Sequence, residues 1–299
     1  WLTMRPMSLY ESADSTGQVS LKDLFDKPDS LEGENNLNID KLAFLICRGG
    51  WPHAVGMREK IALAQAEDYY EAVIKSDINR ADGVSKNPER VKRLLRSLAR
   101  NQGAQIANTM LKNDIVSNDT ESLNEDTIAS YLNALKKIFV IEDMPAWNPN
   151  LRSKTSIRSS DTRYFVDPSI AVSALGAGPQ DLINDLNTMG LLFETLCVRD
   201  LRVYAEKIGG SVLHYRDKSG LECDTVIHLK NGRYGLAEIK LGGQKLIEEG
   251  AANLKALSNK IDTSKMLAPS FLMIIIGVGE FAYKREDGIF IVPIGCLKD

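Results

Sequence analysis

The chain has 299 residues, of which 43% are hydrophobic, and it carries 37 Lys and Arg against 40 Asp and Glu. That length allows about two domains with cores that need no disulfides. The small net charge of -3 excludes attraction of the whole surface to nucleic acid, so such binding requires a local patch. The longest strongly apolar run, 271–278, is far shorter than the roughly 20 residues of a membrane span, and we expect no membrane partner.

The four cysteines are scattered and form no Cys-x-x-Cys pair, and the three histidines do not complete a zinc pattern. No secretory or transit segment opens the chain, which together with the cysteine usage predicts a reducing cytoplasm. The sequence also contains neither a Gly-x-x-x-x-Gly-Lys-Ser/Thr phosphate loop nor a Gly-x-Gly-x-x-Gly fingerprint. The commonest routes to nucleotide binding are therefore absent from it.

The first part of the chain is mainly helical. Residues 1–12 read as an extended segment followed by a turn, because the Arg5-Pro6 step disfavours a helix and residues 12–17 are polar and small. A short helix is expected from Ser20, another over 39–48, and a long one over 59–79.

The next part combines short helices with two strands. Helical patterns occupy 88–101, 105–112 and 123–139, and the last of these has Asn124 as a candidate cap. Two strands, over 140–146 and 164–166, flank a basic polar loop. Three helices followed by a hairpin predict a winged helix.

Basic residues gather at two places in this winged-helix part. Residues 86–100 contain six basic side chains and one acidic one, and further cations lie on the loop. The residues expected to contact DNA phosphates are Arg93, Arg96, Arg152 and Lys154. A solvated helix face or a protein-binding surface is the alternative, because residues 114–126 carry five acids and no base.

The last part, from residue 167, alternates helices and strands. A helix is expected over 181–208, with a break near Gly190, and a second helix over 244–260. The strand patterns cover 212–216, 221–229, 234–240, 271–276, 282–284 and 289–293. They predict an α/β domain with a mixed sheet, so the chain as a whole is a multidomain α+β protein.

Loop geometry predicts where the charges of two strands meet. The three-residue loop Lys230-Asn231-Gly232 places 229 opposite 233, so Asp224 faces Glu238. Lys240, two residues further, then lies on the same side of the sheet as Glu238. A two-residue Asn231-Gly232 turn would instead pair Asp224 with Ile239 and scatter the charges over both faces.

Two carboxylates about 5 Å apart on one face form a hard-oxygen site suited to Mg²⁺. Asp224 and Glu238 are the expected metal ligands, and Lys240 would orient a water or help to deprotonate it. Glu194, on an otherwise apolar helical stripe, is a candidate third carboxylate, with a salt bridge to Arg199 or Arg202 as the alternative. For the strand charges, the alternative is a surface ion-pair cluster.

Glu194, Asp224, Glu238 and Lys240, in the order helix, strand, strand, resemble the PD-(D/E)xK nuclease signature, with Gln244 as an additional match. The segment 215–224 is similar to the version of that fold found at the C-terminus of a group of prokaryotic AAA+-type ATPases.

The resemblance to this ATPase group extends over nearly the whole chain. Its motifs in this sequence are Arg5 to Glu11, Gly49-Gly50-Trp51-Pro52, Tyr69 to Arg80, Arg93 to Phe139, and Phe165 to Pro168. The resemblance implies a helical ATPase lid over 1–80, a winged helix over 81–166 and a nuclease-like domain over 167–299. The phosphate loop and the Walker B strand of the group are expected upstream, so ATP binding is implied for full-length members only.

Two hypotheses follow from these residues. In the first, the chain is the C-terminal part of a nucleic-acid-directed ATPase whose last domain binds Mg²⁺ and cleaves phosphodiesters. In the second, the last domain is a catalytically silent interaction platform that the ATPase moves or regulates. The oligomeric state and the substrate are not encoded in any of these motifs.

Overall fold

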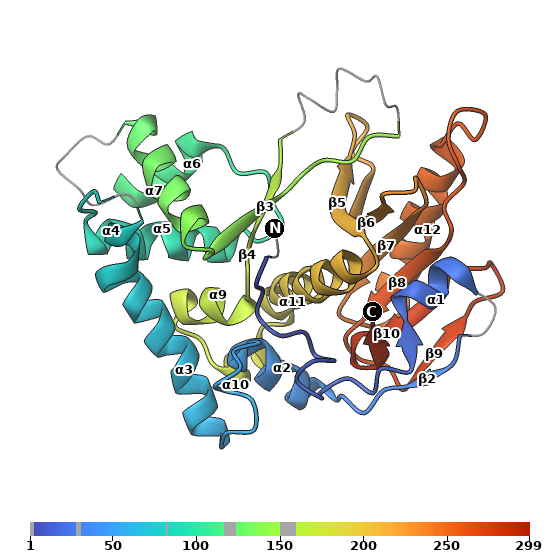
Figure 1. Ribbon diagram of the computed structural model, residues 1–299, viewed down its shortest axis with the longest axis horizontal. Coiled ribbons are helices and arrows are strands. Elements are labelled where there is room, and N and C mark those ends of the chain that lie inside the picture. Colours follow the sequence, from blue (N-terminus) through green and yellow to red (C-terminus); the bar gives the residue numbers. More distant parts are fainter. Residues whose placement is uncertain (1–2, 28–30, 82, 117–123, 150–159) are drawn as a thin grey trace. The chain divides into compact units, whose positions relative to one another are not determined.

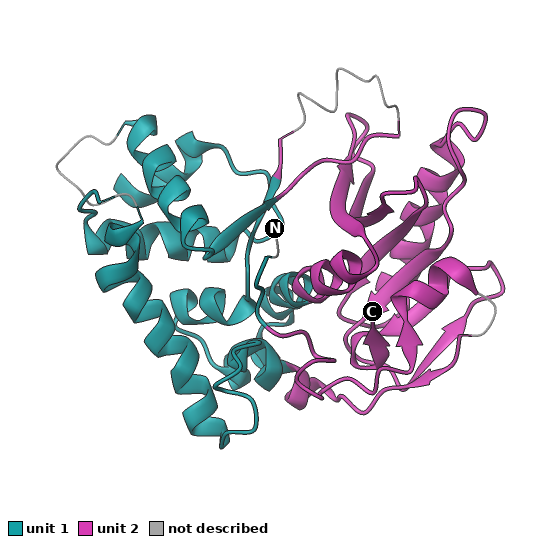
Figure 2. Ribbon diagram, in the orientation of Figure 1, with its two compact units in different colours: residues 1–6, 43–143, 162–196 teal, residues 7–42, 144–161, 197–299 magenta. Residues whose placement is uncertain are grey.

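The structure is a computed structural model that describes residues 3–27, 31–81, 83–116, 124–149 and 160–299. Its contacts divide the chain into two compact units, coloured separately in Figure 2. Unit 1 comprises Trp1–Pro6, Ala43–Asp143 and Thr162–Leu196, and unit 2 comprises Met7–Leu42, Met144–Asp161 and Cys197–Asp299. Each unit therefore combines segments that are distant in sequence. The expected three domains, with boundaries at 80/81 and 166/167, stay a prediction.

A seven-stranded mixed sheet forms the centre of unit 2 (Figure 1). Its strand order is β2-β9-β10-β8-β7-β6-β5. The strands β5, β6 and β7 form an antiparallel series, whereas β8 runs parallel to both β7 and β10. The bounds are β2 (Gly33–Glu34), β5 (Gly210–Arg216), β6 (Glu222–Leu229), β7 (Tyr234–Lys240), β8 (Leu272–Ile276), β9 (Phe281–Lys284) and β10 (Phe290–Pro293). The expected mixed α+β architecture is confirmed.

Helix α12 (Gln244–Lys260) makes the crossover between the parallel strands β7 and β8. Its apolar residues Ile247, Ala251 and Leu254 belong to one buried cluster with Val226 and Ile274 of the sheet. The strand β8 is apolar throughout its length and is largely buried, as expected for a central strand with parallel neighbours. The helix thus covers the face of the sheet on which Val226 and Ile274 lie.

The N-terminal part of unit 2 joins this sheet, which the sequence patterns did not indicate. The strand β2 pairs with β9 at the edge of the sheet. A separate two-stranded sheet pairs β1 (Val19–Ser20) with β11 (Leu297–Lys298), which follows the short helix η2 (Ile294–Cys296). Helix α1 (Leu21–Asp26) follows β1 and contributes Phe25 to the core.

Unit 1 is mainly helical. It contains β4 (Thr162–Phe165) and all but the last residue of β3 (Ile141–Met144), which together form a two-stranded sheet. Two helices, α2 and α11, contribute residues to both units. The helices are α2 (Ile39–Arg48), α3 (Glu59–Ala72), the π-helix η1 (Val73–Asp77), α4 (Ile78–Arg80), α5 (Pro88–Arg100), α6 (Asn108–Val116), α7 (Glu125–Lys137), α9 (Pro168–Leu175), α10 (Pro179–Asn184) and α11 (Leu186–Lys207).

Helices α5, α6 and α7 with β3 and β4 are the elements expected for a winged helix, and that assignment stays a prediction. Among the helices in the described parts of the chain, none is both long and apolar enough to cross a membrane.

One local prediction was wrong. The expected break near Gly190 lies instead at Asp185, whose carboxylate accepts hydrogen bonds from the Thr188 backbone and hydroxyl and so starts α11. Gly190 is accommodated inside that helix. The turn expected after the extended N-terminal segment is present but begins earlier, since Ser12 N donates to Ser8 O and Ala13 has a positive φ of 60°. A turn therefore closes this segment.

A buried carboxylate joins two of the sequence motifs within unit 1. Asp167, fully buried, accepts hydrogen bonds from Gly50 N at 2.8 Å and from the backbone and hydroxyl of Ser169 at 2.9 and 2.6 Å. The indole of Trp51 donates to the Ser169 hydroxyl. Gly49 is required here, because a Cβ atom at this position would lie 2.4 Å from the Asp167 carboxylate. These hydrogen bonds therefore join the Gly49-Gly50-Trp51-Pro52 motif to the segment that begins at Asp167, and we call this group of contacts the Asp167 clasp.

We expect the Asp167→Ala variant to lose about 3 kcal/mol of unfolding free energy, because it leaves the buried Gly50 and Ser169 amides without their acceptor. Urea denaturation measures the loss. Asp185→Ala is the matched control: it removes an exposed cap and should cost only about 1 kcal/mol. Equal losses in both variants would contradict the clasp.

Candidate functional site

The turn between β6 and β7 has the geometry that loop length predicted. Leu229 N donates to Arg233 O at 2.8 Å, which closes a three-residue loop, and Gly232 has a positive φ of 86°. The register that follows pairs Thr225 with Ala237 and continues to the loop without a shift. The three-residue alternative is therefore confirmed, and the two-residue turn is excluded.

This register brings Asp224, Glu238 and Lys240 together, and we call these three residues the Lys240 cluster. The Lys240 ammonium lies 3.1 Å from Asp224 Oδ2 and 2.7 Å from Glu238 Oε2. Because both oxygens contact one nitrogen, they lie within about 6 Å of each other, close enough for a small side-chain movement to bring both onto one divalent cation. The same Asp224 oxygen accepts a hydrogen bond from Ile239 N at 2.7 Å.

The cluster is partly closed to solvent by helix α12. The side chain of Glu238 is only 2% exposed, whereas those of Asp224 and Lys240 are about one-fifth exposed. A Cβ atom on Gly250 of α12 would lie 3.4 Å from Glu238 Cβ and 3.5 Å from Lys240 Cε. Close approach of the helix therefore leaves Asp224 and Lys240 as the accessible side of the cluster.

The charges of the cluster determine what Lys240 can do. Burial of Lys240 opposes its charge, but the Asp224 and Glu238 carboxylates outweigh that effect and hold the pKa of Lys240 above its ordinary value. At neutral pH the side chain is thus an ammonium, which can donate hydrogen bonds but cannot accept a proton from water. That Lys240 orients a water stays a prediction, while deprotonation of a water by this side chain is disfavoured by its positive charge.

Glu194 has a partner that the sequence did not suggest. Within unit 1, its carboxylate accepts a hydrogen bond from the Tyr164 hydroxyl at 2.7 Å. Gly103 lies beside it, since a Cβ atom there would be 2.4 Å from Glu194 Oε1. Arg199, an expected salt-bridge partner of Glu194, pairs with its neighbour Asp200 at 2.7 Å. A distant tyrosine has no signature in the local sequence, which is why this contact was missed.

Gln244, the additional match to the nuclease signature, begins α12. Its amide donates to Glu248 Oε1 at 2.7 Å, one turn along the same helix. This hydrogen bond uses the amide nitrogen of Gln244. Because the bond is exposed to solvent, it is weak. Glu222 is exposed as well and pairs with Arg216 at 3.1 Å.

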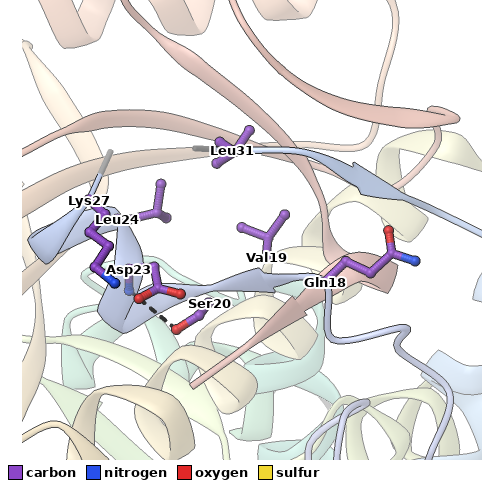
Figure 3. Close-up of a pocket in the computed structure, with 7 residues that line it drawn as sticks. All are labelled: Gln18, Val19, Ser20, Asp23, Leu24, Lys27 and Leu31. Atoms are coloured by element: carbon purple, nitrogen blue, oxygen red, sulfur yellow. Dashed lines mark hydrogen bonds between the residues drawn. The ribbon is translucent and has the colours of Figure 1, made fainter. Parts of the chain in front are cut away.

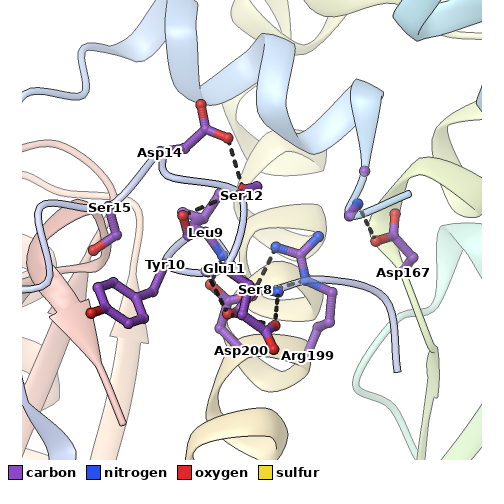
Figure 4. Close-up of polar contacts among 12 residues, drawn as sticks. Ser8, Leu9, Tyr10, Glu11, Ser12, Asp14, Ser15, Asp167, Arg199 and Asp200 are labelled. Carbon is purple, nitrogen blue, oxygen red and sulfur yellow. Dashed lines mark hydrogen bonds and ion pairs between the residues drawn. The ribbon is translucent and has the colours of Figure 1, made fainter. Parts of the chain in front are cut away.

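A second polar group, missed from the sequence, anchors the N-terminal segment of unit 2 (Figure 4). Asp200 of α11 is fully buried; its carboxylate accepts a hydrogen bond from Leu9 N at 2.9 Å and pairs with the buried Arg199. Ser8 N and its hydroxyl donate to Glu11 in the same segment. The adjacent Arg199 and Asp200 in an apolar helix were the available signal for a buried ion pair.

The expected nucleic-acid residues divide into three groups. Arg96 on α5 is exposed, whereas Arg93 is half-buried and donates to Ile115 O at 2.9 Å, at the end of α6. Arg152 and Lys154 lie outside the described residues. Arg93 therefore holds a contact within the fold, whereas its contact with DNA is only expected. Arg96 is the more accessible of the two cations.

The donor set of the Lys240 cluster fits a weakly held divalent cation. It offers carboxylate oxygens on adjacent strands, the type of ligand that Mg²⁺ prefers. Over the described residues, however, no group of three or more His, Cys, Asp or Glu side chains is arranged to hold a metal ion. Two carboxylates with a partly open side require water or a substrate oxygen to complete the coordination.

Two protein families match consecutive parts of the chain. Residues 39–181 match a domain of unknown function (DUF8612), and residues 189–297 match a second domain of unknown function (DUF4143). The second family commonly follows AAA domains in prokaryotic ATPases. No curated protein and no solved structure matches significantly. The Lys240 cluster lies within the part of the chain that is similar to the second family.

The Lys240→Met variant should be less stable than the wild type by about 3 kcal/mol at pH 7, because it leaves the buried Glu238 charge without its cation. Burial then favours protonated Glu238, so the deficit should shrink as the pH falls toward 4.5. In the wild type, the raised pKa of Lys240 means that its contribution is present at neutral pH and is lost only above the ordinary lysine pKa of about 10.4.

Urea midpoints between pH 4.5 and 7.5 measure this effect. Lys245→Met is the control, since Lys245 on α12 is 89% exposed and 3.9 Å from Glu249, a pair that contributes little. A Lys240→Met deficit that is absent, or that stays constant with pH, would contradict the assigned coupling.

Proposed function

We propose that the chain is part of a prokaryotic AAA-type ATPase and that its mixed sheet carries a PD-(D/E)xK-like site for Mg²⁺-dependent cleavage of phosphodiesters. The match to a family that commonly follows AAA domains supports the first part. One observation carries the second: a single ammonium contacts carboxylates from two adjacent strands, in the order of residues that resembles the nuclease signature.

In this proposal, Asp224 and Glu238 hold the metal, which would supply Lewis acidity and an activated water when bound. The Asp224 oxygen is oriented by Ile239 N, so its position does not depend on the ion. Lys240, as a permanent ammonium, would donate a hydrogen bond to the attacking water or to a phosphate oxygen. The proton acceptor would be another group, for example a second phosphate oxygen of the substrate.

In this proposal Glu194 does not bind the metal directly and is only a carboxylate outside its ligands. Its hydrogen bond with Tyr164 gives it a structural role already. In this proposal ATP would bind at a phosphate loop, a motif that this sequence does not contain.

A silent interaction module is the second candidate, and a specific observation favours it. Lys240 already compensates part of the charge of both carboxylates, so part of the role of a metal is filled by a side chain. In that case the cluster would serve only to hold β6 and β7 in register. The two functions differ in whether added metal displaces Lys240 from the carboxylates.

Asp224→Asn should abolish the binding of Mg²⁺ and Mn²⁺ measured by isothermal calorimetry, because the amide removes half of the carboxylate donors. Cleavage of DNA in the presence of either metal should fall with it. Glu222→Gln, an exposed carboxylate on the same strand, is the matched control and should bind metal as the wild type does. No binding by the wild type at millimolar metal would rule out the nuclease and leave the silent module.

For nucleic acid, we propose that α5 contacts phosphates through its exposed cations. Arg96→Gln should weaken the binding of a DNA duplex and lower the salt slope, measured by fluorescence anisotropy, by about one, since one phosphate contact is lost. Its stability should be unchanged. Arg93→Gln should in addition lower the unfolding free energy, because it removes the bond to Ile115 O. If Arg96→Gln binds DNA as the wild type does, α5 is a protein-binding surface instead.

A further inference from the structure

A cavity of about 380 Å³ lies in unit 2, away from the residues of the Lys240 cluster. It is formed by helix α1, the end of α11 and the loop between β6 and β7. This volume is within the range of about 300 to 1,000 Å³ that is usual for sites of small ligands. A second cavity, on another face of α1, has about 30 Å³, room for little more than one water (Figure 3). Only the larger cavity can hold an organic molecule.

The apolar part of the larger cavity consists of Phe25, Ile208 and Leu229. Phe25 and Leu229 are buried and belong to the core, so their positions are well defined. The guanidinium of Arg233 lies 5.7 Å from the centroid of the Phe25 ring, in a cation–π arrangement. Since the Arg233 side chain remains 37% exposed, part of its planar group is available to stack on a flat ligand.

The charged groups at the cavity leave one positive charge unmatched. Arg233 pairs with Asp26 at 2.8 Å, and Lys207 forms an ion pair with Asp299. Lys22, on α1, is the remaining cation, and within the described structure it has no ion pair or hydrogen bond. A ligand in this cavity therefore meets an apolar floor, a planar cation at one side and a single available ammonium.

We propose that this cavity binds a small monoanion with a flat apolar body, such as an aromatic carboxylate or sulfonate. The anionic group pairs with Lys22, and the flat body packs on Leu229 and stacks on Arg233. A dianion is disfavoured, because Asp26 and Asp299 lie at the same cavity and only one cation is uncompensated. This site is independent of the proposed metal site.

The probe is naphthalene-1-sulfonate, with 1-naphthol as a ligand of the same ring system that lacks the charge. Calorimetric titration of the full chain should show saturable binding of the sulfonate. Lys22→Gln should raise its dissociation constant roughly five- to tenfold, the effect of one charge-assisted hydrogen bond in a half-open site. The same substitution should leave the dissociation constant of 1-naphthol unchanged.

Lys60→Gln, a change of an exposed lysine on α3, controls for net charge and should bind both ligands as the wild type does. The proposal is overturned if the sulfonate shows no saturable binding or if Lys22→Gln and Lys60→Gln bind it equally. It is also overturned if Lys22→Gln weakens both ligands to the same extent, because Lys22 would then act on the shape of the cavity. None of these outcomes depends on metal binding or cleavage.

Discussion

The register of β6 against β7 is the constraint on which the candidate site depends. Gly232, with its positive φ of 86°, allows the three-residue loop that sets this register. A slip of one residue would place Asp224 opposite Ile239 and send its carboxylate to the other face of the sheet. Val226 and Leu236, on the cluster's face, are buried under α12, so the same slip would also expose core residues. Packing and site geometry therefore select the same register.

One ammonium shared between two carboxylates compensates part of the negative charge of this arrangement. Partial burial strengthens the attraction between these charges but also costs their hydration, so removing one partner destabilises the fold by more than the intact group stabilises it. Glu238 is the most buried member, and the close approach of Gly250 keeps water away from it. A metal bound here would have to compete with Lys240 for Asp224 and Glu238. The two proposed functions therefore differ in what compensates the charges of Asp224 and Glu238: a bound metal in the nuclease, and Lys240 alone in the silent module.

Local patterns were sufficient to predict the hairpin, its register and the three residues of the cluster, because loop length and strand alternation act over a few residues. They were not sufficient for contacts between distant segments. The pairing of β2 with β9, the hydrogen bond between Tyr164 and Glu194, and the clasp of Asp167 on Gly50 each join residues far apart in sequence. Such contacts depend on how whole elements pack, and no single segment encodes them.

The most direct test of the account is the titration of the Lys240 ammonium by NMR, with and without Mg²⁺. The account predicts a pKa above the ordinary value of about 10.4 in the absence of metal, and a lower one when Mg²⁺ draws on the same carboxylates. A Lys240 pKa at or below the ordinary value without metal would contradict the shared ion pair. A raised pKa that Mg²⁺ leaves unchanged would contradict the metal site and leave the cluster a purely structural one.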